Sequence, residues 1–277
     1  MGGVLALVDA GWEAPAPVLA GCLVALALFG LAFWRLRERG RADHAGWDRA
    51  VLFCAAVLLT YLALASPLDG LGDRYLISAH MLQHVVIGDL APALGLLALR
   101  GPLTFFVLPA PLLSMLAGLR WLRALLHWLT GPWVALPLWI AAVWAWHVPR
   151  FYDYAATHPA VHDLEHLSFV LVGVLVWTLL IDPARTGRLP VAGRIGVAVA
   201  VFAAGDPVSA GLISSGASYP HYVAQPHRVF GLTPHGDQVL AGVVMLVEQI
   251  ATLGTLCAVL LWPHLKRAPL RDESVQL

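Results

Sequence analysis

Residues 78–90 read SAHMLQHVVIGDL, and this stretch decides how the rest of the sequence is interpreted. It lies in an apolar run long enough to cross a membrane as a helix, yet it carries His80, Gln83, His84 and Asp89. Placing a charged side chain at the centre of a bilayer costs about 2.5–3.5 kcal/mol on insertion scales. Such residues normally face a bundle interior or a cavity, so this stretch predicts a functional site inside a membrane protein.

The composition supports a membrane environment. Of 277 residues, 59% are hydrophobic and 12% are charged, and the mean hydropathy is +0.75. Soluble domains carry about 25% charged residues. The surroundings are therefore expected to be membrane lipid, and no nucleic-acid partner is expected. Cys22, Cys54 and Cys257 are isolated in apolar runs, which indicates core packing rather than a disulfide framework.

Hydropathy, punctuated by proline, glycine and charge, predicts an all-α polytopic membrane protein with a seven-transmembrane helix bundle. The first residues lack the basic region of a secretory signal, so the first span is expected to remain in the mature chain. A single domain, 1–264, precedes a cytoplasmic tail, 265–277. The predicted spans are 16–34, 50–66, 76–99, 132–148, 162–181, 194–214 and 237–262.

The distribution of basic residues favours seven spans over eight. With the N-terminus outside and the C-terminus cytoplasmic, 14 of the 17 Lys and Arg residues lie on the inner side, as the positive-inside rule requires. An eighth span at 102–119 would make the two sides nearly equal, and that segment is interrupted by three prolines. The following stretch places Arg120, Arg123 and His127 opposite a row of leucines, which predicts an interfacial helix on the cytoplasmic side.

This topology also sorts the twelve histidines unevenly. Three fall on the inner side, and the other nine fall on the outer side or in the outer half of a span. A lone histidine near a helix end is more often hydrogen-bonded than a ligand, and we interpret His158, His221 and His227 in that way. The outer nine are His80, His84, His147, His158, His162, His166, His221, His227 and His235.

Two predicted helices carry the same His-x-x-x-His spacing. His80 and His84 share one face of the third span, and His162 and His166 share one face of the fifth, with Glu165 beside them. Imidazoles at this spacing can hold one metal ion and leave other positions to neighbouring helices. We therefore predict a metal site in which Glu165 is a ligand or fixes an imidazole tautomer.

Further candidate ligands lie at the matching depth. His147 ends the fourth span, and Asp237 and Met245 lie in the outer half of the seventh, followed by Glu248. Imidazole with thioether on the outer face favours copper, while a di-iron centre or a haem held by histidines is left open. Asp89 lies opposite His80 on its helix and belongs to another contact. Asp206, before Pro207, and Asp89 are each open to a relay or a capping role.

Several motifs resemble those of the CtaG family of seven-span cytochrome c oxidase assembly factors, which is distinct from the single-span copper chaperone of the same label. They run from Ser66 to Met245 in the family's order. They are SPLDGL, SAHMLQH, WHVPRFYDYA, HDLEHLSF, YPHYV and TPHGDQVLAGVVM. The resemblance implies functional roles for the residues His80, His84, His147, His162, His166 and Asp237. Glu248 departs from the family pattern, in which that stretch is usually apolar or rich in Gly and Pro.

We therefore expect a multi-pass protein of the bacterial cytoplasmic membrane that acts in oxidase assembly. As a metallochaperone it would deliver copper on the outer side to a haem-copper oxidase subunit and receive it from a donor protein. No nucleophile with a base and no phosphate loop is evident, so no enzyme activity is expected. The alternatives are a copper transporter and a di-iron or haem redox protein.

Overall fold

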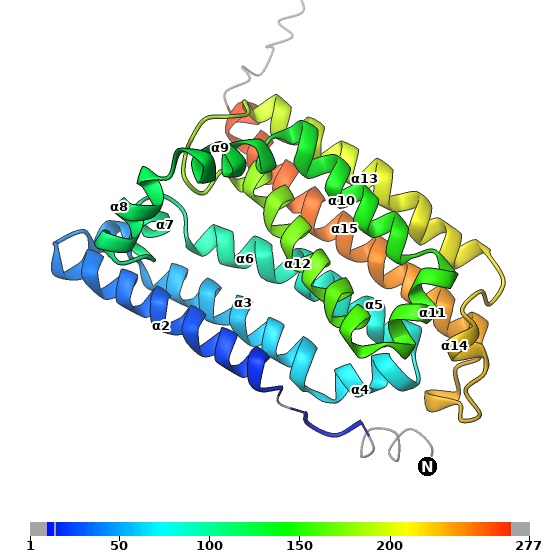
Figure 1. Ribbon diagram of the computed structural model, residues 1–277. Coiled ribbons are helices and arrows are strands. Elements are labelled where there is room, and N and C mark those ends of the chain that lie inside the picture. Colours follow the sequence, from blue (N-terminus) through cyan, green and yellow to red (C-terminus); the bar gives the residue numbers. More distant parts are fainter. Residues whose placement is uncertain (1–9, 14, 267–277) are drawn as a thin grey trace, which may run out of the picture.

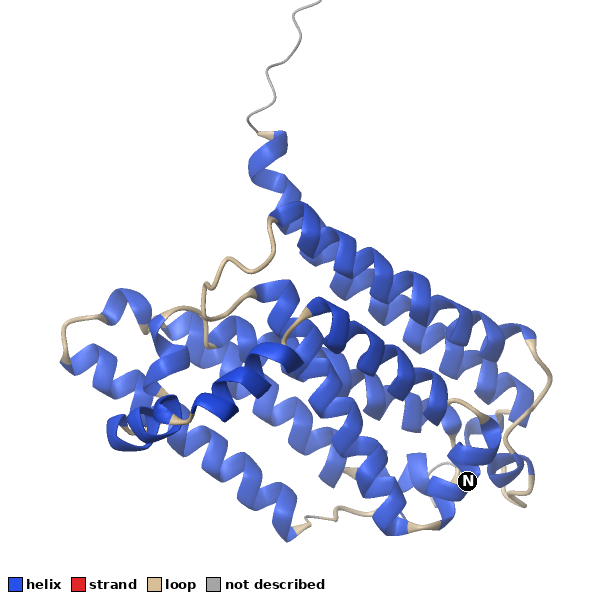
Figure 2. Cartoon of the chain, turned by 45° about the horizontal axis from the view of Figure 1, so that its top comes forward, coloured by secondary structure: helices blue, strands red, loops and turns tan. Residues whose placement is uncertain are grey.

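Every regular element in the described part of the chain is a helix (Figures 1 and 2). The computed structural model describes residues 10–13 and 15–266. The long helices are α2 (Ala16–Glu38), α3 (Trp47–Ala65), α10 (Pro132–Trp146), α12 (Pro159–Ile181), α13 (Val191–Ser214) and α15 (Pro234–Leu265). The shorter ones are α4 (Pro67–Arg74), α5 (Ile77–Val85), α6 (Ala91–Ala98), α7 (Pro102–Phe106), α8 (Ala110–Gly118), α9 (Arg120–Leu129), α11 (Pro149–Thr157) and α14 (Pro220–Val223).

The helix lengths confirm a polytopic helical membrane protein. Within the described residues, six segments are long and apolar enough to cross a bilayer alone, and a seventh counts only if α9 and α10, bent by 63°, form one span. The predicted fourth span, 132–148, is too long, because α10 ends at Trp146 and has only 15 residues. Val148 adopts an extended conformation, which the following Pro149 imposes by steric exclusion of the helical region.

The proline-rich segment does not form a span. Residues 102–119 fold as α7 and α8, of five and nine residues, separated at Pro109. The predicted interfacial helix is α9, where none of the residues is buried in the protein. Of the predicted tail, 265–277, all but the first two residues lie outside the described part of the chain.

The short helices gather at the two ends of the bundle (Figure 1). The α4 end is formed by α4, α11 and α14, and the opposite end by α7, α8 and α9. Between them α13 packs along α15, α3 along α6, and α5 against α15. The last turns of α15 extend beyond the neighbouring helices (Figure 2).

The third span lies at the centre of this arrangement. Its apolar window is 67% buried inside the protein, compared with 22% for α2 and 17% for α3. The span consists of α5, a π-helical turn (Val86–Leu90) and α6. A Cβ on Gly173 of α12 would lie 2.0 Å from the carbonyl oxygen of Gly88 in that turn. Gly173 therefore lets α12 approach the third span closely enough for their side chains to meet.

Candidate metal centre

The two predicted histidine faces meet in the structure. Glu165 of α12 lies between the histidines of α5, with carboxylate oxygens 3.8 Å from His80 Nε2 and 3.6 Å from His84 Nε2. These distances are too long for hydrogen bonds. They leave a gap between the ligand-type atoms rather than a closed ion pair.

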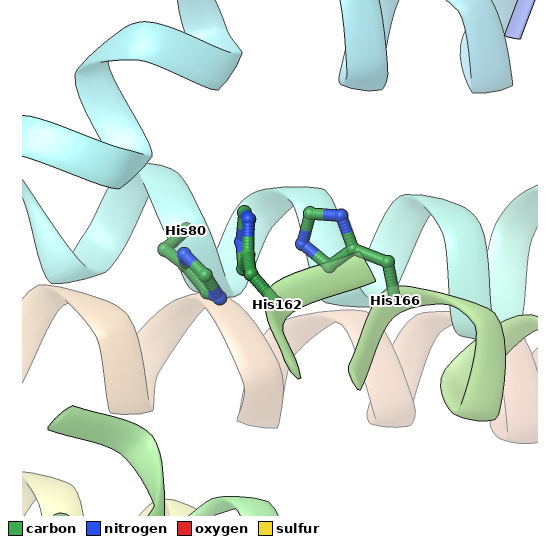
Figure 3. Close-up of side chains that lie close together, drawn as sticks. All are labelled: His80, His162 and His166. Atoms are coloured by element: carbon green, nitrogen blue, oxygen red, sulfur yellow. The ribbon is translucent and has the colours of Figure 1, made fainter. Parts of the chain in front are cut away.

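The imidazole rings of His80, His162 and His166 lie side by side (Figure 3). The His80 ring centroid lies 4.3 Å from that of His84, 5.1 Å from that of His162 and 5.5 Å from that of His166. Among the described residues, two sets have one ligand atom per residue within 4.8 Å of one another. One is His80, His162 and His166, and the other is His80, His84 and Glu165. His80 belongs to both sets.

The polar atoms of this group are buried and lack hydrogen-bond partners. His80 and Glu165 are each 1% exposed and His84 is 4% exposed. Within the described residues, no hydrogen bond reaches either ring nitrogen of His80 or His84 or either carboxylate oxygen of Glu165. The Nε2 atoms of His162 and His166 also lack hydrogen-bond partners among these residues. Each unsatisfied buried polar group costs about 1–3 kcal/mol, so this concentration calls for a ligand that satisfies them together.

His147 lies beside this group and contacts a thioether. Its Nδ1 is 2.6 Å from its own helix's Val143 carbonyl oxygen, which can only accept a hydrogen bond. In the neutral ring Nε2 then carries the lone pair, and it faces the sulfur of Met81 at 3.2 Å. The His147 and His84 ring centroids are 6.4 Å apart. Met245 is buried in the same apolar cluster as Met81.

Asp237 is placed differently from the histidines. Its two carboxylate oxygens accept backbone N–H groups from Ile77 at 2.8 Å and Ser78 at 3.1 Å, at the first turn of α5. These N–H groups have no partner inside the helix, and a carboxylate is favoured there. Asp237 therefore ties α15 to the start of α5 and positions the helix that carries His80 and His84.

An acidic group connects the histidines with the α4 end. Asp73 Oδ1 lies 3.4 Å from His162 Nε2, and the Asp73 side chain is 41% exposed. Burial raises the pKa of the Asp73 carboxyl, whereas positive charge on His162 or Arg74 lowers it. Asp69, one turn earlier on α4, accepts a hydrogen bond from Gln83 Nε2 at 2.7 Å. Asp73 was not among the predicted site residues, although its position four residues after Asp69 is a signal for a shared helix face.

A set of tyrosines holds the α4 end together. Tyr222 donates to the Gly72 carbonyl oxygen at 2.6 Å, and its hydroxyl lies 2.7 Å from that of Tyr152. Tyr219 donates to the His147 carbonyl oxygen at 2.9 Å. The expected hydrogen-bonded histidines include His158, which contacts the Tyr154 carbonyl oxygen, and His221, which contacts that of Asp73. These contacts explain the WHVPRFYDYA and YPHYV motifs as parts of one scaffold.

The donor set fits a transition-metal ion. Neutral imidazole binds zinc, copper, iron and nickel, and thioether ligands favour Cu(I). Four imidazoles and one carboxylate surround the gap, with a fifth imidazole and a thioether at its edge. A single cation would satisfy several of the unpartnered atoms at once and balance the charge of Glu165.

Comparison with known proteins assigns the chain to a family. Residues 27–267 match the family described as cytochrome c oxidase caa3 assembly factor (Caa3_CtaG). No curated protein matches the chain, and neither does any solved structure. The match covers most of the chain, including all the helices that carry the histidine group. The protein therefore belongs to the family of cytochrome c oxidase caa3 assembly factors.

Proposed function

We propose that this assembly factor is a copper metallochaperone whose cargo binds between α5 and α12. The observation that carries the proposal is the set of buried nitrogen and oxygen atoms of His80, His84, Glu165 and His166 that lack hydrogen-bond partners. His162 completes the donor set towards Asp73. His147 and Met81 add a softer pair, which suits Cu(I). In this role the protein is not an enzyme.

The orientation proposed for this function places the α4 end outside the bacterial cytoplasmic membrane. The opposite end carries most of the basic residues, including Arg49, Arg100 and Arg188. Arg49 donates to the carbonyl oxygen of Arg100, and Arg188 donates to the Thr130 hydroxyl at 2.8 Å. An excess of basic residues is typical of the cytoplasmic side. The histidine group then lies near the outer surface, where a copper donor and a haem-copper oxidase subunit can reach it.

Asp73 and His162 are partly exposed, and they give copper a stepwise path into the site. A cation first meets a carboxylate at the α4 end and then the ring of His162, behind which His80 and His166 lie. Several imidazoles share the ion without forming a closed tetrahedral cage of thiolates. Such a site can release its ion to a subunit that offers stronger ligands.

The metal content of the purified protein tests this proposal. The full chain is loaded with copper, desalted and measured by mass spectrometry, alongside a His84→Ala/His166→Ala double variant. His158→Ala is the matched control, because His158 is exposed and outside the histidine group. We expect about one copper per chain in the native and control proteins and a loss of copper in the double variant. Equal copper in all three folded proteins, or none in the native chain, would contradict the proposal.

A further inference from the structure

A small cavity with several polar lining residues lies beside His84. It has a volume of about 40 Å³ and is lined by residues of α5, the π-helical turn, α10, α12 and α15. Its polar lining residues are His84, Asp89, His147, Glu248 and Gln249. One water molecule needs about 10–15 Å³ of cavity volume, so the cavity has room for an ion or a few waters.

The acidic residues of this cavity lie well inside their helices. Asp89 is twelve residues from the start of the helix at Ile77, and Glu248 is fourteen residues from the start of α15 at Pro234. At 1.5 Å per residue, these distances correspond to about 18 Å and 21 Å along the helix axes. Carboxylates at such a depth are costly, and they normally pair with another group or with an ion.

An unpartnered amide independently indicates a ligand in the cavity. Gln249 is only 5% exposed, and its Oε1 has no hydrogen-bond partner among the described residues. Glu248 Oε1 is unpartnered in the same sense. Asp89 is 9% exposed and accepts one hydrogen bond, from Trp177 Nε1 at 2.6 Å. Two oxygen acceptors of the lining residues, Glu248 Oε1 and Gln249 Oε1, therefore have no hydrogen-bond partner among the described residues.

The backbone is adapted to this arrangement at two points. The π-helical turn Val86–Leu90 contains Asp89, and such turns inside α-helices are frequently found at functional sites. Gly205 of α13 makes room for Gln249, because a Cβ there would lie 2.3 Å from Gln249 Nε2. The Gln249 amide therefore packs against α13 at Gly205.

We propose that Asp89, Glu248 and Gln249 form a second cation site, distinct from the histidine centre, that takes a divalent metal ion preferring oxygen ligands. Two carboxylates neutralise the charge of one divalent ion, which the low dielectric of the membrane interior favours. Carboxylate and amide oxygens suit hard divalent ions such as Mn²⁺. The proposal does not depend on which ion occupies the histidine centre.

Binding of Mn²⁺ to the purified full chain, followed by electron paramagnetic resonance, tests this site. Mn²⁺ is the probe because it prefers oxygen donors and ranks lowest in affinity for nitrogen ligands. We expect one bound Mn²⁺ per chain, and an affinity reduced at least tenfold by Glu248→Gln and by Asp89→Asn. Gln249→Leu, which leaves both carboxylates in place, should weaken binding several-fold.

Two controls separate this site from other acidic and metal-binding groups. Asp206→Asn removes a half-buried acid of α13 that does not line the cavity, and His80→Ala/His166→Ala disrupts the histidine centre. Both should bind Mn²⁺ like the native chain, and Glu248→Gln should still bind copper. The proposal is overturned if the native chain binds no Mn²⁺, or if binding survives in Glu248→Gln/Asp89→Asn. It is also overturned if the histidine variant alone abolishes Mn²⁺ binding.

Discussion

The histidine centre and the tyrosine scaffold at the α4 end are both buried and polar, but they differ in how their polar atoms are satisfied. Tyr222, Tyr219 and Asp237 each donate to or accept from a backbone group within 2.6–3.1 Å. The ring nitrogens of His80 and His84 have no such partner. Satisfied polar groups stabilise a fold, whereas unsatisfied ones destabilise it unless a ligand is present. The satisfied residues build the site, whereas the unsatisfied ones are those that we propose bind the ion.

The largest effect predicted by this contrast concerns His80, which belongs to both ligand sets. We expect His80→Ala to reduce copper affinity by at least about 100-fold, because it removes the ligand that both sets share. Competition with a chelator of known affinity measures the change, and His158→Ala is the control. An affinity within a few-fold of native would place the copper elsewhere.

Substitution of Asp237 should lower stability rather than copper affinity. Asp237→Ala removes the acceptor for two N–H groups of α5, so we expect the free energy of unfolding to fall by about 2–3 kcal/mol. Asp237→Asn should restore part of the loss, because asparagine also caps helices. Unfolding in increasing concentrations of sodium dodecyl sulfate measures both variants. Loss of copper at unchanged stability would instead make Asp237 a ligand, as the sequence predicted.

The stability of the folded protein should depend on pH through Asp69. Burial and the charge of Asp73 raise the pKa of Asp69 to about 7. The folded state then holds this proton more tightly than the unfolded state does, so its stabilising effect is present at low pH and is lost as pH rises from about 4 to about 7. Relative to Asp69→Asn, native stability should decline by about 2 kcal/mol over this window, a value reduced by solvent screening of the half-buried carboxyl. A constant difference between the two proteins would show that this pKa is not raised.

The smallest predicted effect is that of Tyr222→Phe. The variant loses the hydrogen bond to the Gly72 carbonyl oxygen and the contact with the Tyr152 hydroxyl. We expect a loss of about 1 kcal/mol in the free energy of unfolding, with unchanged copper content. A marked loss of copper in a stable Tyr222→Phe protein would mean that the scaffold and the centre are not separable.

Sequence periodicity was sufficient to predict the histidine faces, because residues at i and i+4 share a face in any α-helix. The long apolar helices followed from hydropathy, apart from α10, which ends shortly before Pro149 begins α11. Asp237 could not be assigned in this way, because its role depends on the packing of α15 against the start of α5, 159 residues earlier in the chain. The contact between His147 and Met81 likewise depends on the packing of separate helices.

Copper-dependent stability shows whether the histidine and glutamate atoms without hydrogen-bond partners bind an ion. The unfolding midpoints of the native chain and of His84→Ala/His166→Ala are measured with and without copper. A ligand that binds only the folded state raises stability with its concentration, so copper should stabilise the native chain and leave the double variant unchanged. Without copper, the double variant should be at least as stable as the native chain. A variant strongly destabilised without copper, together with a native chain that copper does not stabilise, would contradict the account.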